Sequence, residues 1–75
     1  MSKKSDAIIT KGVIQREQGS GFFLVELEEP EGHTCLCRAA GRLITAKIKL
    51  LAGDKVTVEL SPYDLTRGRI TLREK

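Results

Sequence analysis

The sequence has few aromatic residues and no long apolar segment. Among its 75 residues are two phenylalanines, one tyrosine and no tryptophan. A protein that stacks many nucleobases on its surface needs more aromatic side chains than this. No apolar run approaches the roughly 18–20 residues of a membrane-spanning helix, so we expect no contact with membranes. The first residues carry charge without an apolar segment after them, so we expect no secretory signal and a cytoplasmic protein.

The sequence also lacks the residue sets that catalysis or metal binding requires. Its single histidine, His33, has no evident base or nucleophile partner, so we predict no catalytic residue and no enzyme. Cys35 and Cys37 share one face if they lie on a strand. Neither a Cys-x-x-Cys pair nor a second histidine completes a tetrahedral set, so we predict no metal site and no cofactor. We interpret both cysteines as reduced core residues, as a reducing compartment allows.

The sequence does contain a series of short segments in which apolar and polar residues alternate, and this pattern predicts strands. The predicted strands cover residues 7–17, 22–28, 33–39, 55–60 and 69–73. Gly12 interrupts the first of them, where we expect a bulge or a sharp bend. In the last strand, Ile70 and Leu72 are expected to face the core.

The segments between these strands predict one helix and one long loop. Residues 42–51 carry apolar side chains at Ile44, Ile48 and Leu51, a spacing that predicts a short helix or 3-10 segment. Residues 61–68 read as a loop, in which we favour packing of Tyr63 on the end of the sheet over direct contact with RNA.

Five strands, each with one apolar face, must curl to bury those faces, because so short a chain supplies no second layer. The economical solution is a small closed or partly open all-β barrel. A short helix between the third and fourth strands is the order of a five-stranded OB-fold, which we predict. The alternative is an SH3-like barrel, which usually lacks that helix. We expect a flexible tail at residues 1–6 and a single RNA-binding domain at residues 7–75.

Charge is segregated along the chain, although the net charge is only +3. Acidic residues gather at 17–31, whereas residues 32–53 and 61–75 are rich in bases. Such segregation steers an anionic partner to one side of a protein. Because aromatic residues are scarce, we expect contacts with the backbone of folded RNA to dominate. The predicted RNA-binding residues are Arg38, Arg42, Lys47, Lys49, Arg67 and Arg69.

One segment resembles a known family closely. Gly53–Ile70 reads GDKVTVELSPYDLTRGRI and resembles bacterial translation initiation factor one, the smallest initiation factor. Gly12, Phe23–Glu28 and the pair Gly41–Arg42 extend the resemblance over nearly the whole chain. The resemblance implies an OB-fold that binds the small ribosomal subunit, and its ribosomal RNA, at the aminoacyl-tRNA entry site. It also implies that the protein blocks premature tRNA entry and cooperates with the second and third initiation factors.

The resemblance assigns some of the basic residues by position. Arg42, Arg67 and Arg69 match basic positions of the family, and Lys49 matches a frequent arginine. Ile44 stands where the family often has a second base, although Lys47 keeps charge nearby. The acidic loop at 29–31 is longer than usual. We expect a monomer that performs no chemistry.

Two other binding functions stay open at this point. A general RNA-binding module of the cold-shock type would need stacking aromatic residues on the second and third strands, and the third has none. A protein-interaction barrel would instead use the acidic residues 17–31 as its working surface.

Overall fold

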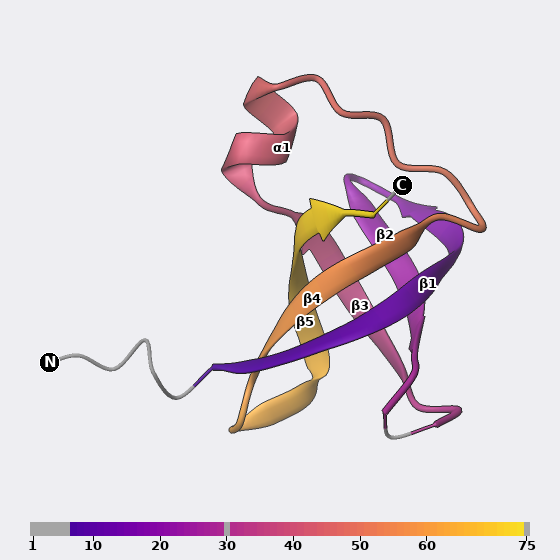
Figure 1. Ribbon diagram of the computed structural model, residues 1–75, viewed down its shortest axis with the longest axis vertical. Coiled ribbons are helices and arrows are strands. Elements are labelled where there is room, and N and C mark those ends of the chain that lie inside the picture. The colour runs from indigo at the N-terminus through magenta and orange to yellow at the C-terminus, as the bar shows by residue number, and fades with distance from the viewer. Residues whose placement is uncertain (1–6, 30, 75) are drawn as a thin grey trace, which may run out of the picture.

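Over residues 7–29 and 31–74, which the computed structural model describes, the chain forms a closed barrel of five strands with one short helix (Figure 1). The elements are β1 (Ile8–Gly19), β2 (Phe22–Leu27), β3 (Thr34–Ala39), α1 (Gly41–Thr45), β4 (Lys55–Ser61) and β5 (Asp64–Arg73). Around the barrel the order is β1-β2-β3-β5-β4, in which β3 and β5 are parallel. This order, with the helix between β3 and β4, confirms the predicted OB-fold. The expected tail at 1–6 lies outside the described residues.

The long strand β1 closes the barrel because it pairs with two neighbours. Its first half is antiparallel to β4 and its second half to β2. Gly12 belongs to both pairings, and a Cβ atom there would lie 2.7 Å from Glu26 O and 2.7 Å from Val25 Cγ1. The glycine is therefore needed for close approach of neighbouring strands. The register places the bulges of β1 after Ile14 and after Glu17, and not at Gly12.

The inward faces of the strands form the core together with residues of α1 and of the segment after it. The buried members are Ile14, Val25, Leu27, Cys35, Cys37, Leu43, Leu50, Val56, Val58, Leu60 and Ile70. The two cysteines are free thiols, and their Sγ atoms are hydrogen-bonded at 3.2 Å. That hydrogen bond and burial raise the pKa of Cys37, which keeps its thiol neutral. The predicted role of both cysteines as core residues is confirmed.

The long loop predicted at residues 61–68 is wrong. β4 ends at Ser61 and β5 begins at Asp64, so Pro62 and Tyr63 form a two-residue turn. The Tyr63 amide donates to Ser61 Oγ at 3.1 Å, a side-chain cap that stabilises the turn. Tyr63 itself is 89% exposed, so the expected packing of its ring on the barrel end is also wrong.

Leu72 points to solvent and not to the core as predicted. The register pairs Val58 with Ile70 but Thr57 with Leu72, so β5 has one extra residue, Thr71, at this point. A bulge of this kind shifts the alternation of inward and outward side chains. Ile70 is consequently buried completely, whereas Leu72 is 53% exposed.

The predicted helix over 42–51 is much shorter in the structure, because α1 ends in a Schellman motif. The Lys47 amide donates to Ile44 O at 3.0 Å, and the Ile48 amide donates to Leu43 O at 3.0 Å. Lys47 takes the left-handed conformation, with φ of 57°, at the position where glycine is usual.

The early end of α1 changes which apolar residues are buried. Leu43 and Leu50 enter the core, and Ile48 packs against it. Ile44 and Leu51, which helical spacing placed on the buried face, are exposed. None of the described residues belongs to a helix long and apolar enough to cross a membrane.

Candidate nucleic-acid interface

The structure divides the six predicted RNA-binding residues into two groups. Arg38, Arg67 and Arg69 lie on β3 and β5, and we call them the strand arginines. Arg42, Lys47 and Lys49 lie on α1 and the segment after it, and we call them the loop bases. All six side chains are exposed. Figure 1 shows α1 and this segment passing over one end of the barrel.

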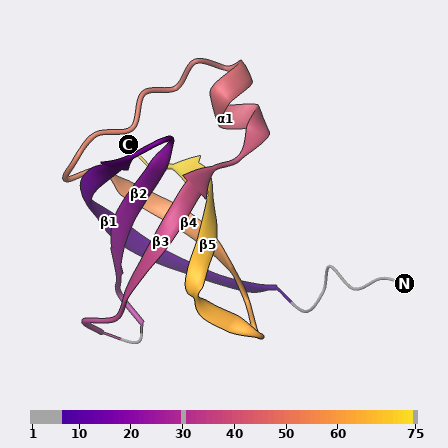
Figure 2. The same cartoon turned by 180° about the vertical axis from the view of Figure 1, so that it is seen from behind.

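The strand arginines share the outer face of the parallel β3–β5 pair. The register places Arg38 opposite Arg69, and Arg67 lies two residues before Arg69 on β5. Because Gly68 and Ile70 are the inward residues of this stretch, the arginines between and before them point outward. Figure 2 shows β2, β3 and β5 side by side on this side of the barrel.

One strand arginine has an acidic partner that the sequence did not reveal. Arg69 Nη2 lies 2.8 Å from Glu59 Oε1, across the β4–β5 pairing. Both side chains are partly exposed, so the ion pair contributes little to stability and mainly restricts the position of the guanidinium. Glu59 and Arg69 are ten residues apart in the sequence, and only the register of β4 against β5 puts them side by side.

The same face carries an aromatic contact. The guanidinium carbon of Arg38 lies over the ring of Phe22, 5.3 Å from its centroid. The two residues are directly opposite each other in the β2–β3 pairing. Leu24 and Leu36, also opposite each other, are half-buried next to them. The outer face of β2, β3 and β5 is therefore both basic and partly apolar.

The loop bases are positioned by the Schellman motif and by β5. Arg42 lies in α1, Lys47 is the left-handed residue of the motif, and Lys49 follows it. Arg73 Nη1 donates to Lys49 O at 2.8 Å, which ties the segment to the end of β5. Arg73 is thus a positioning residue that the sequence analysis did not single out, because nothing in the sequence shows that β5 reaches this carbonyl.

A cleft of about 520 Å³ lies between the segment after α1 and the barrel. Its apolar surface includes Phe23 and the exposed Ile44, and its lining also includes Lys47 and Lys49. Two of the loop bases therefore border an apolar hollow, so this end of the barrel, like the strand face, offers cations next to apolar surface.

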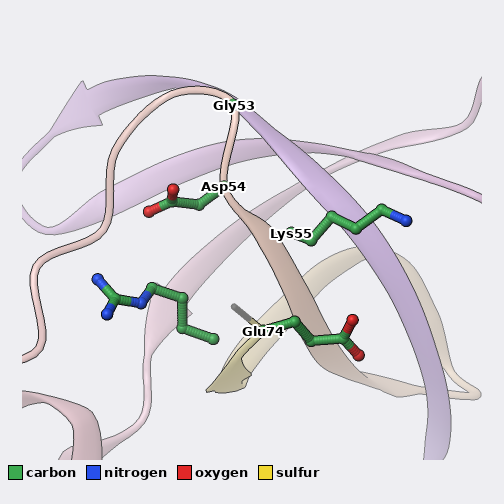
Figure 3. A pocket seen from close by; sticks show the side chains of 5 residues that line it. Gly53, Asp54, Lys55 and Glu74 are labelled. Carbon is green, nitrogen blue, oxygen red and sulfur yellow. The ribbon is translucent and has the colours of Figure 1, made fainter.

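A second hollow, of about 350 Å³, has mixed charge and is shown in Figure 3. Lys55 and Glu74 point to one side of it, and Asp54 points to the other. Glu74 Oε2 lies 2.8 Å from Lys11 Nζ, and this contact lowers the pKa of Glu74 and raises that of Lys11. Lys55 lies 3.5 Å from Glu28. Because Lys55 and Glu74 are each paired with an opposite charge and Asp54 adds a carboxylate, this hollow is a poor site for an anion.

Nearly the whole chain is similar to one family of known proteins. It matches the model of the translation initiation factor 1A / IF-1 family over residues 2–75. It is similar to the solution structure of the translation initiation factor IF-1 from the Wolbachia endosymbiont strain TRS of Brugia malayi. The identity is 30% and the TM-score is 0.76, over 99% of this chain and 85% of that chain.

Two larger proteins contain a similar fold. YjeQ from Thermotoga maritima is 25% identical with a TM-score of 0.74, over 91% of this chain and 23% of that chain. YloQ, a circularly permuted GTPase, is 24% identical with a TM-score of 0.75, over 100% of this chain and 25% of that chain. The latter likeness shows the fold alone. The family match, in contrast, spans nearly the whole sequence and confirms the predicted resemblance: this chain belongs to the translation initiation factor 1A / IF-1 family.

Proposed function

We propose that this translation initiation factor binds the small ribosomal subunit at the aminoacyl-tRNA entry site, through contacts between its basic residues and the ribosomal RNA backbone. Bound there, it blocks premature tRNA entry and acts together with the second and third initiation factors. The observation that carries the RNA contacts is the register of β3 and β5, which gathers Arg38, Arg67 and Arg69 on one exposed face.

The chemistry of the two groups fits a phosphate backbone. The guanidinium of arginine presents a planar set of donors that can pair with a phosphate through two hydrogen bonds, whereas lysine acts as a flexible point charge. The strand arginines lie on a rigid sheet and fix the orientation of the contact. The loop bases lie at one end of the barrel and extend the contact beyond the sheet. Contacts of this kind position a protein on folded RNA without reading its sequence.

Sedimentation of the protein with isolated bacterial small ribosomal subunits tests the proposal. Arg67→Glu should weaken binding at least about tenfold, because it removes a phosphate contact and adds a repelling charge. Arg16→Glu is the matched control, since Arg16 is an exposed arginine of β1 outside both groups. We expect that control to change the affinity by less than about twofold. The proposal fails if the unaltered protein does not bind small subunits at low salt, or if both variants weaken binding equally.

A further inference from the structure

Phe22 and Arg38 form a cation–π contact on the outer face of β2 and β3. We propose that one unpaired RNA nucleobase stacks on the outer side of the Arg38 guanidinium, so that Phe22, Arg38 and the base form a three-layer stack. The inference rests on the proposed function, because it adds a single base contact to a surface that otherwise binds phosphates.

The geometry of the pair supports such a stack. Phe22 and Arg38 are direct cross-strand partners, and the guanidinium carbon lies over the ring at 5.3 Å. Phe22 is half-buried, which fixes the ring in the sheet, whereas Arg38 is exposed. A guanidinium is planar and has two faces. With the guanidinium carbon over the phenyl ring, the side of the guanidinium away from that ring is available to a second planar group. RNA-binding proteins stack bases on arginine planes.

The surroundings favour a nucleotide over another planar ligand. Arg69 lies beside Arg38 in the parallel register, and Arg67 lies two residues away on the same outward face. A nucleobase stacked on Arg38 would therefore have two arginines within reach of the phosphates that flank it. Leu24 and Leu36 supply half-buried apolar surface at the adjacent position. Apolar surface of this kind suits the flat face of a nucleobase better than it suits a free phosphate.

The remaining aromatic residues limit the platform to one base. Phe23 packs against the core and lines the cleft below the segment after α1, away from the outer face that carries Phe22. Tyr63 lies in the turn between β4 and β5, outside the strands that carry Phe22 and Arg38. Stacking on a single platform tolerates every base, because each has a flat aromatic face. The contact should therefore depend on the presence of a base and only weakly on its identity.

The test compares two single-stranded ligands of equal charge, hexauridine and a six-unit abasic ribose-phosphate chain, at low salt. Phosphate contacts are the same for both, so their affinity ratio isolates the base. We expect hexauridine to bind at least about fivefold more tightly, the lower end of what one stacked base contributes. Hexauridine should also shift the NMR signals of the Phe22 ring and of the Arg38 Nε–H group, and the abasic chain should shift them much less.

Arg38→Lys keeps the charge but removes the plane, so it should abolish the preference for hexauridine. Phe22→Leu removes the ring and should reduce the preference, with the NMR signals of core methyl groups confirming that the barrel is intact. Arg16→Lys is the control, an exposed arginine hydrogen-bonded to Gln18, and should leave the preference unchanged. Equal affinities of the unaltered protein for both ligands, no detectable binding of hexauridine, or a preference that survives Arg38→Lys would overturn the proposal.

Small-subunit binding separates this proposal from the broader one. If the stack is absent but the proposed function is right, the protein still binds small subunits and Arg67→Glu still weakens that binding. If the proposed function is wrong, the unaltered protein fails to bind small subunits, whatever the result with hexauridine.

Discussion

At the scale of single residues, the barrel depends on the absence of a side chain at Gly12. Gly12 lies where β1 passes between its two partners, and an added Cβ would meet a carbonyl oxygen and a valine methyl at 2.7 Å. The backbone oxygen cannot move without disturbing the β1–β2 ladder. The sequence marked Gly12 as unusual, but it did not distinguish a bulge from a close approach, because that difference depends on the neighbouring strand.

Replacement of this glycine should therefore destabilise the fold. We expect Gly12→Ala to lower the free energy of unfolding by about 1–3 kcal/mol, the usual cost of overpacking. Urea denaturation followed by circular dichroism measures the change. Gly41→Ala is the control, because a Cβ atom there meets nothing within 4 Å. A loss of stability as large in the control would show that close contact at Gly12 is not the cause.

The carboxyl group of Asp64 gives a second test at this scale. The Thr66 hydroxyl and the Thr66 amide both donate to it, and they lower its pKa below the ordinary 3.8. Thr66→Val removes the hydroxyl donor, so the pKa of Asp64 should rise toward 3.8 in an NMR titration of its carboxyl carbon. Because the pKa is lowered in the folded state, the stabilisation is present above about pH 4 and is lost as the pH falls through the folded pKa. An unchanged titration midpoint in the variant would exclude this hydrogen bond as the cause.

At the scale of elements, the strands were predictable and their connections were not. The strand predicted at residues 55–60 is β4, and its buried Val56, Val58 and Leu60 alternate with more exposed residues, because a strand with one wet face has a period of two. The same reasoning failed at Leu72, because a bulge at Thr71 depends on the partner strand. It failed again at residues 61–68. The turn-forming residues of this segment resemble a loop in the sequence, but from Asp64 onward they belong to β5 and pair with β4.

The end of the helix was likewise not predictable from the sequence. Residues 44, 48 and 51 have helical spacing, but a left-handed residue at Lys47 ends α1 and reorients the chain. Lysine in this conformation is strained by about 1–2 kcal/mol relative to the right-handed one, and glycine avoids that strain at a smaller entropic cost. The sequence offers no glycine at this point, so the end of the helix had no signal.

A substitution at Lys47 should separate folding from binding. Lys47→Gly is expected to raise the free energy of unfolding by roughly 0.5–1 kcal/mol, because it relieves the left-handed strain. The same variant should bind small ribosomal subunits more weakly, since it lacks one loop base. Thermal denaturation and sedimentation with subunits measure the two effects. If stability and affinity change in the same direction, the residue acts through folding alone and is not a contact.

At the scale of the whole molecule, the arrangement of charge matters more than its total. The net charge of +3 is small because ten acidic residues offset thirteen basic ones. The sequence predicted which residues are basic and exposed, but it could not show that Arg38 and Arg69 are neighbours. They are far apart along the chain, and only closure of the barrel through the parallel β3–β5 pair brings them together. For the same reason, the Glu59–Arg69 and Phe22–Arg38 contacts were outside the reach of sequence reasoning.

Binding through phosphates implies a steep dependence on salt. If the strand arginines and loop bases together engage about four or five phosphates, affinity for the small subunit should fall roughly 10²-fold between about 50 and 200 mM salt, by analogy with duplex DNA. Titrations at several salt concentrations give the slope. Arg67→Glu should make that slope shallower by about one phosphate contact. A salt-independent affinity would mean that apolar contacts dominate the interface.

The most direct test of the central claim is chemical probing of small-subunit ribosomal RNA with and without the protein. We predict protection confined to the decoding region at the aminoacyl-tRNA entry site, and we predict that Arg67→Glu diminishes it at equal protein concentration. Protection elsewhere on the subunit, or none at a concentration that saturates binding, would contradict the account.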